Sequence, residues 1–116
     1  MKIAGAQISC MLGDFSANLR KVRDFAVLAK KSGAELIVFP EMADTGYSMP
    51  VIEKHAKKWS DGAVPELQKI AKEISIAVVA GISERDGASI FNSQVLVNGQ
   101  GEVVAKYRKT DRKSVV

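Results

Sequence analysis

The sequence contains a single cysteine, Cys10, so no disulfide can form within the chain. Chains that do not depend on disulfides are typical of reducing compartments, and we expect a cytoplasmic location. The N-terminus lacks the charged segment, apolar run and small-residue cleavage site of a secretory signal. No apolar run approaches the ~20 residues that cross a membrane as a helix. These absences predict a soluble protein that has no membrane partner.

Motifs for metals, phosphates and dinucleotides are also missing. The one histidine, His55, stands among lysines, where we expect it to be exposed, and a metal site would need further ligands. The sequence holds no HExxH, CxxC, Walker loop or GxGxxG. The glycine-containing stretch 98–101 separates two expected strands, whereas a phosphate loop precedes a helix. We therefore predict neither a metal ion nor a cofactor.

The formal net charge of +4 arises entirely near the C-terminal end. The charged residues there are Lys106, Arg108, Lys109, Arg112, Lys113 and Asp111. The rest of the chain, residues 1–105, carries twelve basic and twelve acidic groups. A neutral body with a short basic end is a weak signal for nucleic acid, because nucleic-acid-binding domains carry basic residues over a whole face. We do not expect a nucleic-acid partner, and salt-dependent retention on a polyanion column would test that alternative.

Hydrophobic periodicity predicts a single α/β domain. Apolar residues at helical spacing follow Asp14 and Ser16, either of which can cap a helix that ends before Gly33. A second amphipathic helix follows Pro65, and a short one fits 51–59. Continuous apolar runs predict buried strands, and a glycine-containing loop predicts a hairpin. The expected strands cover 2–9, 36–39, 76–82, 90–97 and 102–107, which gives the order β-α-β-α-β-β-β, with parallel early strands and an antiparallel hairpin.

Glu41 is the first candidate for chemistry, because it directly follows a buried strand and Pro40. Ligands of open α/β sheets bind at the carboxyl ends of the strands, where a carboxylate can serve as a general base. Lys109 follows another strand, and its ammonium group suits the stabilisation of an oxyanion. Glu84 also follows an expected strand. By position alone, each of the three is more commonly a solvated charge, and Cys10 more commonly a small buried side chain.

Several short motifs follow one another along the chain. These motifs are Ala6-Gln7, Gly13-Asp14 with Asn18, Phe39-Pro40-Glu41-Met42 with Gly46-Tyr47-Ser48, Gly81-Ile82-Ser83-Glu84, Phe91-Asn92-Ser93, Gly101-Glu102, and Tyr107-Arg108-Lys109-Thr110. Their order resembles that of the nitrilase superfamily of carbon–nitrogen hydrolases. Each alone is weak, but together they span residues 1–110 in the family's order. Residues 111–116 form a basic tail that does not follow the family pattern.

The resemblance implies an α-β-β-α sandwich of which this chain supplies roughly the first half. It also implies hydrolysis of small amides, nitriles or carbamoyl compounds by a glutamate, a lysine and a cysteine through a thioester. Carried over by motif, Glu41 is the general base, Lys109 stabilises the oxyanion and Glu84 is a second supporting acid, while Tyr47 lines the pocket. Cys10 does not match the family's cysteine motif, so we expect a truncated chain that is inactive alone.

Two further expectations follow from an incomplete sandwich. The sheet face carrying Val78, Val95 and Val97 would lack its covering sheet, and the chain would form homo-oligomers through that face. The alternative to an enzyme is a non-catalytic structural or interaction protein that keeps the fold without the chemistry.

Overall fold

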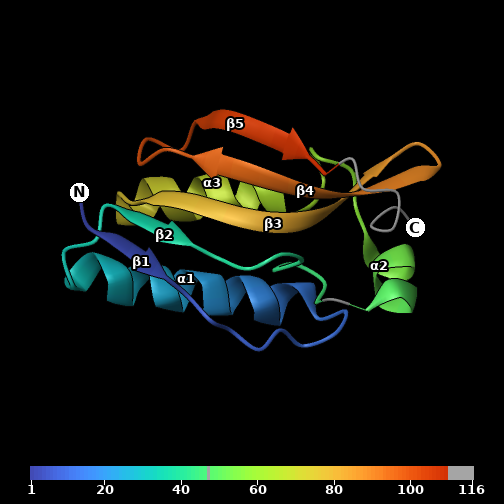
Figure 1. Ribbon diagram of the computed structural model, residues 1–116, viewed down its shortest axis with the longest axis horizontal. Helices are drawn as coiled ribbons and strands as arrows, with labels where there is room; N and C mark the ends of the chain where they lie inside the picture. Colours follow the sequence, from blue (N-terminus) through green and yellow to red (C-terminus); the bar gives the residue numbers. More distant parts are fainter. Residues whose placement is uncertain (47, 110–116) are drawn as a thin grey trace.

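A five-stranded sheet with two helices packed on one face organises the chain (Figure 1). The computed structural model describes residues 1–46 and 48–109. The elements in chain order are β1 (Ile3–Gly5), α1 (Phe15–Lys31), β2 (Leu36–Val38), α2 (Met49–His55), α3 (Ala63–Ile74), β3 (Ala77–Asp86), β4 (Ser89–Val97) and β5 (Val103–Arg108). The α/β class and the expected order of the strands and the two long helices are confirmed, and the short helix that fits 51–59 is observed as α2. β1 is shorter than expected, and β3 runs four residues beyond 82.

The strands lie in the sheet in their chain order, β1-β2-β3-β4-β5. β1, β2 and β3 are parallel, and β4 and β5 each pair antiparallel with the preceding strand. β5 therefore runs in the same direction as β2. The carboxyl ends of β2 and β5 consequently face the same end of the sheet, the end near α2 in Figure 1.

Local signals explain where the two long helices begin and end. The side chain of Asp14 caps α1 by accepting a hydrogen bond from the backbone N–H of Ala17 at 3.0 Å. Gly33, with φ +88°, follows the end of α1. Pro65 lies in the first turn of α3, where its missing N–H leaves no hydrogen bond unmade. Thus the expected cap at Asp14 and the glycine stop are both confirmed.

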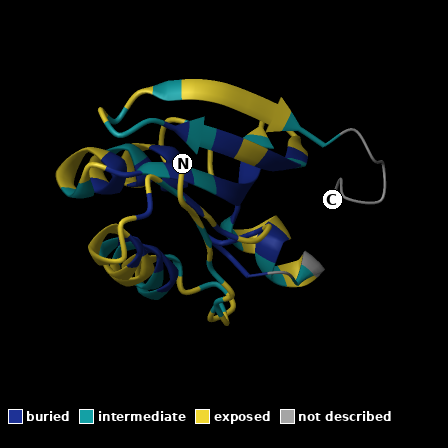
Figure 2. Cartoon of the chain, turned by 60° about the vertical axis from the view of Figure 1, so that its left-hand side comes forward, coloured by how far each residue is buried: buried dark blue, intermediate teal, exposed yellow. Residues whose placement is uncertain are grey.

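The core lies between the sheet and the helices α1 and α3, as the buried band in Figure 2 shows. Val22 and Ala26 of α1 and Leu67 and Ala71 of α3 are all buried in one cluster with the sheet. From the sheet, Ile37, Val78, Ala80, Val95 and Val97 join this cluster. The expectation that Val78, Val95 and Val97 lie on an uncovered face is therefore wrong, because the helices cover them.

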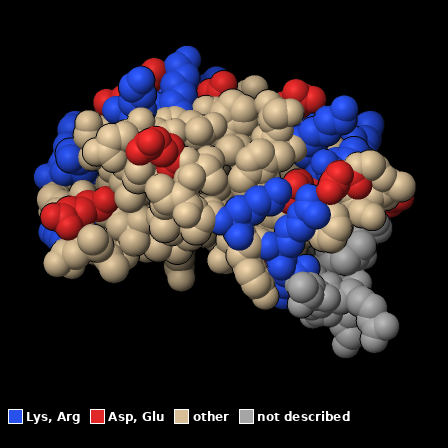
Figure 3. Space-filling view, turned by 90° about the horizontal axis from the view of Figure 1, so that it is seen from above, with Lys and Arg blue, Asp and Glu red and all other residues tan. Residues whose placement is uncertain are grey.

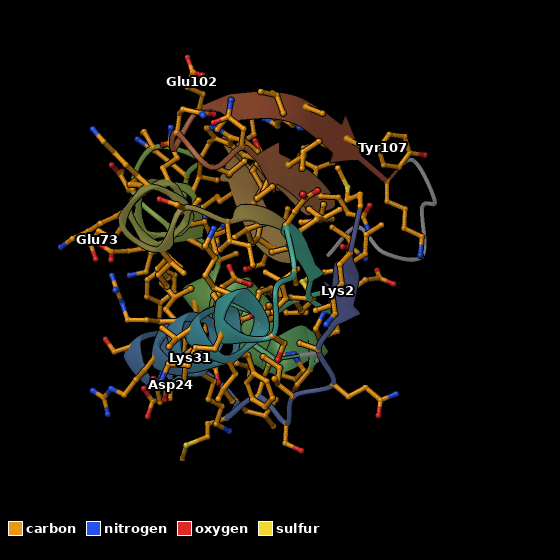
Figure 4. All side chains as sticks on the ribbon, turned by 90° about the vertical axis from the view of Figure 1, so that its left-hand side faces the viewer. Lys2, Asp24, Lys31, Glu73, Glu102 and Tyr107 are labelled. Atoms are coloured by element: carbon orange, nitrogen blue, oxygen red, sulfur yellow. The ribbon has the colours of Figure 1, made fainter. Side chains whose placement is uncertain are left out.

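The opposite face of the sheet carries several exposed apolar side chains. Ile3 is 58% exposed and Val38 is 38% exposed, and both alternate with core residues of the same strands. Tyr107 of β5 lies on this face as well, pointing away from α1 and α3 in Figure 4. We call this surface, defined by Ile3, Val38, Leu96 and Tyr107, the open face.

Candidate active site

Glu41 and Lys109 meet at the end of the sheet where β2 and β5 both finish. Glu41 follows β2 after Phe39 and Pro40, and Lys109 directly follows β5. The Lys109 Nζ atom lies 3.8 Å from Oε2 of Glu41. Because both side chains are about two-fifths exposed, this ion pair contributes little to stability. The expected meeting of the two residues at one end of the sheet is thus observed.

Asn92 of β4 connects these two residues. Its side-chain amide donates a hydrogen bond to Oε2 of Glu41, and its backbone carbonyl accepts one from the backbone N–H of Lys109 at 2.9 Å. Although Asn92 is polar, only 2% of its surface is exposed. Buried polar groups in folded proteins are almost always paired, and here one partner is the carboxylate of Glu41.

A cavity of about 240 Å³ opens beside the two charged groups. Its described lining residues are Glu41, Asn92, Gln94, Tyr107 and Lys109. Gln94 and Tyr107 are register partners on β4 and β5, so their side chains share one face of the sheet. A larger hollow of about 410 Å³ lies between α1 and α3, far from this chemistry. The smaller cavity is the candidate active site because a carboxylate, an ammonium group and amide side chains converge there.

Sequence reasoning did not assign a role to Asn92, Gln94 or Tyr107. Two of them stood inside motifs that carry the family resemblance, Phe91-Asn92-Ser93 and Tyr107-Arg108-Lys109. Strand alternation was the available signal. Tyr107 of β5 and Lys109, the residue after β5, lie two residues apart, so their side chains are expected on the same face. Tyr47, which the resemblance places in the pocket, lies outside the described residues.

Close backbone contact with β3 holds the loop that carries Glu41. Gly81 accepts a hydrogen bond from the backbone N–H of Ala43 at 2.8 Å and donates one to the Pro40 carbonyl at 3.3 Å. A Cβ atom built on Gly81 would lie only 2.5 Å from the Cα of Glu41. Met42, which follows Glu41 in the loop, has φ +54°, a sparsely populated conformation for a residue other than glycine. The position of Glu41 thus depends on glycine at 81.

Asp44 fastens the same loop to β3 through its buried carboxylate. The carboxylate accepts hydrogen bonds from the backbone N–H of Ser83 at 3.0 Å, from its hydroxyl at 2.9 Å, and from the Thr45 N–H at 2.9 Å. The Asp44 carbonyl accepts a further bond from the side chain of Asn18. Burial raises the pKa of Asp44, and the hydrogen bonds from Ser83 and Thr45 offset only part of this rise.

The raised pKa of Asp44 predicts how stability depends on pH at this position. Because the pKa is higher in the folded state, folding favours the protonated form, and stability falls as pH rises through the folded-state pKa. We expect Asp44→Asn to remove this loss while keeping an oxygen acceptor, so the variant should gain stability relative to the parent as pH rises. Urea unfolding across the acidic and neutral range measures this, with the exposed Asp24→Asn as control. An identical pH profile for the parent and Asp44→Asn would contradict the expectation.

Glu84 does not join Glu41 and Lys109. It lies inside β3, not after it, and strand alternation places its side chain on the opposite face from Ser83 and the Asp44 loop. Lys106 and Arg108 each contact its carboxylate at 2.8 Å, and Ser93 donates at 2.7 Å. Burial alone would raise the pKa of Glu84, but these hydrogen bonds outweigh it and lower the pKa to about 2. The structure therefore places the Glu84 carboxylate in a buried ion-pair cluster with Lys106 and Arg108, outside the described lining of the cavity, and its expected supporting role stays a prediction.

Cys10 lies outside the lining of the candidate active site. It is half-buried, and its Sγ contacts the carbonyl of Ala43 at 3.7 Å. Burial raises the pKa of the thiol, Lys21 lowers it and Asp44 raises it further, for a net rise. A thiol with a raised pKa is therefore less often in the nucleophilic thiolate form at neutral pH.

His55, expected to be exposed, is half-buried near Gly13.

Within residues 1–46 and 48–109, no group of three or more His, Cys, Asp or Glu side chains is placed to hold a metal ion. In the same part of the chain, no helix has the length and apolar character needed to cross a membrane. Basic and acidic side chains are intermixed on the face in Figure 3.

Comparison with known proteins adds independent findings. The family model described as carbon-nitrogen hydrolase matches residues 2–115. A nitrilase of Pyrococcus abyssi is 34% identical over 113 residues, which are 94% of this chain and 43% of the relative. An aliphatic nitrilase of Rhodococcus rhodochrous is 32% identical, covering 94% of this chain and 32% of the relative. The crystal structure of an amidase from Nesterenkonia sp. superposes with a TM-score of 0.88 at 29% identity, covering 96% of this chain and 43% of the amidase. The chain thus spans about two-fifths or less of the length of these relatives.

Proposed function

Because this chain belongs to the carbon–nitrogen hydrolase family, we propose that its Glu41–Lys109 pocket is part of a site that hydrolyses small amides, nitriles or carbamoyl compounds. The observation that carries the proposal is the 3.8 Å approach of Lys109 Nζ to Glu41 Oε2 beside a cavity of about 240 Å³. An amidase of this structural group has been solved in complex with acrylamide, a small amide. The size of the cavity suits a ligand of that class.

The proposed chemistry needs a nucleophile in addition to the two charged residues. With an amide substrate, Glu41, as general base, takes the proton of a cysteine thiol, and the sulfur then bonds to the substrate's carbonyl carbon. Lys109 stabilises the negative oxygen of the tetrahedral intermediate. As the carbon–nitrogen bond breaks, Glu41 returns its proton to the leaving amine, which leaves a thioester. Water then attacks the thioester, giving the acid and restoring the thiol.

We expect the 116-residue chain to show no measurable amide or nitrile turnover, because Cys10 lies outside the pocket and its thiol pKa is raised. Ammonia release from propionamide and propionitrile, together with intact-mass detection of an acyl-enzyme, measures this. Turnover or a thioester adduct that Cys10→Ala abolishes would overturn the expectation.

The site itself is tested by binding. Titration of propionamide into isotope-labelled protein should shift the resonances of Asn92, Gln94 and Tyr107, which line the pocket. Lys109→Ala should weaken these shifts, whereas Lys31→Ala, at the far end of α1, should leave them unchanged. Shifts confined to other surfaces would count against the proposed site.

A non-catalytic structural or interaction role is the second candidate, favoured by the position and raised thiol pKa of Cys10. The two candidates differ in what the encoding DNA should contain. A cysteine motif of the family downstream of codon 116, in any frame, supports the enzyme. Absence of the motif combined with absence of amide binding supports the second candidate.

We also propose that the isolated chain self-associates through its open face. β5 is an edge strand of the sheet, and the open face presents Ile3, Val38, Leu96 and Tyr107. Burying even ~400 Å² of apolar surface contributes about 10 kcal/mol, which favours a second copy of the chain as the cover. We expect Ile3→Ser to reduce the associated fraction in sedimentation at tens of micromolar.

Leu28→Ser provides a matched control for this test. Leu28 and Ile3 are both 58% exposed, but Leu28 belongs to α1 and not to the open face. Sedimentation of the parent chain as a monomer, or an equal effect of the two substitutions, would reject self-association through this face.

A further inference from the structure

Asn92 occupies a position that neither packing nor sheet pairing explains. It lies in the middle of β4, opposite Ser83 of β3, with 2% of its surface exposed. An unpaired amide buried there would destabilise the protein, because it would lose its hydrogen bonds to water without gaining others. A serine, threonine or valine would satisfy the strand as well, because the ladder uses only the backbone. The amide side chain therefore calls for an explanation in terms of what it contacts.

The contacts of Asn92 reach both charged residues of the pocket through different groups. Its Nδ2 donates to Oε2 of Glu41, which fixes one oxygen of the carboxylate. Its backbone carbonyl accepts from the Lys109 N–H at 2.9 Å, which continues the β4–β5 pairing one residue past Arg108. Lys109 Nζ approaches the same oxygen, Oε2. Asn92 thus fixes the position of the Glu41 carboxylate relative to the backbone of Lys109.

We propose that Asn92 is a positioning residue that fixes the rotamer of Glu41 and assigns Oε1 as the oxygen that accepts the proton. The proposal rests on the proposed role of Glu41 as general base. With Asn92 and Lys109 both directed at Oε2, the other oxygen of the carboxylate carries the proton transfer. A base must be held within hydrogen-bond distance of the proton that it takes, so fixing its rotamer is a catalytic requirement.

The chemistry of the amide explains why asparagine suits this position. Its N–H is a neutral donor that neither titrates nor competes for the proton that Glu41 must carry. An aspartate would place a second negative charge against Glu41, and a serine side chain is too short to make the same contact without movement of the strand. Hydrogen bonds to an ionised acceptor are also stronger than those between neutral groups.

The first experiment follows the side-chain amide of Asn92 by NMR in the intact chain. Its proton and nitrogen resonances should depend on pH, and Glu41→Gln should abolish that pH dependence. Glu35→Gln, which removes an exposed carboxylate elsewhere, should leave it unchanged. Persistence of the pH dependence in Glu41→Gln would overturn the proposal. This comparison leaves Asn92 intact, so it remains decisive even if substitution of Asn92 prevents folding.

The second experiment substitutes Asn92 with alanine and measures the rotamer distribution of the Glu41 side chain by NMR. The three-bond scalar couplings of the Glu41 side chain should change from values typical of one rotamer to values averaged over several rotamers. The backbone N–H of Lys109 should stay protected from exchange, because its acceptor is the backbone carbonyl of residue 92. A merely structural role for Asn92 would alter the overall stability and leave the rotamer of Glu41 unchanged, which would reject the proposal.

These readouts do not require turnover, so they separate this inference from the proposed function. Failure of propionamide to bind, with the Asn92 signal still following Glu41, would reject the hydrolase site and leave the positioning contact standing. Binding of propionamide with no link between Asn92 and Glu41 would reject the positioning role alone.

Discussion

Glu84→Gln is expected to lower the free energy of unfolding by about 3 kcal/mol at neutral pH. Glu84 is 2% exposed and neutralises two cations, Lys106 and Arg108, through contacts of 2.8 Å. The cations also lie over aromatic rings, with Lys106 Nζ 3.9 Å from the centroid of Trp59 and Arg108 Cζ 4.2 Å from that of Phe91. Glutamine removes the negative charge that holds both cations against these rings. Denaturation in urea measures the loss.

The lowered pKa of Glu84 reflects the same ion-pair cluster. Hydrogen bonds from Arg108, Lys106 and Ser93 overcome the effect of burial and lower the pKa from 4.5 to about 2. At ~1.4 kcal/mol per pKa unit, this corresponds to about 3–4 kcal/mol of pH-dependent stability. Since the folded-state pKa is the lower one, this stability is present above pH 4.5 and is lost as pH falls from 4.5 toward 2. The Glu84→Gln variant should lack this part of the acid unfolding profile.

Glu35→Gln is the control, because Glu35 is an exposed carboxylate. Its effect should stay within ~0.5 kcal/mol. If Glu84→Gln were as stable as this control, or kept the parent's loss of stability between pH 4.5 and 2, the ion-pair cluster would not be the source of stability that its geometry indicates.

Gly81→Ala is expected to destabilise the fold by about 3 kcal/mol and to displace Glu41. The added Cβ would lie 2.5 Å from the Cα of Glu41 and 3.1 Å from the carbonyl oxygen of Pro40. These are backbone atoms, which cannot turn aside as a flexible side chain can. The loop must therefore move away from β3, stretching the hydrogen bond from the Ala43 N–H to the Gly81 carbonyl. Urea unfolding measures the stability, and NMR measures the contact between Glu41 and Asn92.

Gly5→Ala separates a close-approach effect from a general effect of alanine in a strand. Gly5 lies in β1, and a Cβ built there meets no atom within 4 Å. The Gly5 variant should keep both the stability of the parent and the contact between Glu41 and Asn92. Parent-like behaviour of Gly81→Ala would show that the loop does not depend on glycine at 81.

The sequence by itself determined the secondary structure and the end of the sheet where the site lies. The apolar spacing after Asp14 predicted α1. The cap at Asp14 could be predicted because its side chain accepts a hydrogen bond from the backbone of a residue only three positions away. The residues after the strands pointed to Glu41 and Lys109, and the motif resemblance assigned them to one pocket. Such signals are local, or are ordered along the chain, and can be read before any tertiary contact is known.

Only the tertiary structure decided which side of the sheet each strand residue occupies. Residues 76–82 are almost uniformly apolar, so their sequence does not distinguish the helix-covered face from the open one. The expectation about Val78 failed for this reason, and Glu84, expected to follow a strand, lies within one because β3 continues to Asp86. A shift of one residue along a strand moves a side chain to the other face. The packing of α1 and α3 fixes that choice, and with it the burial of Glu84, the exposure of Tyr107 and the contact of Asn92 with Glu41.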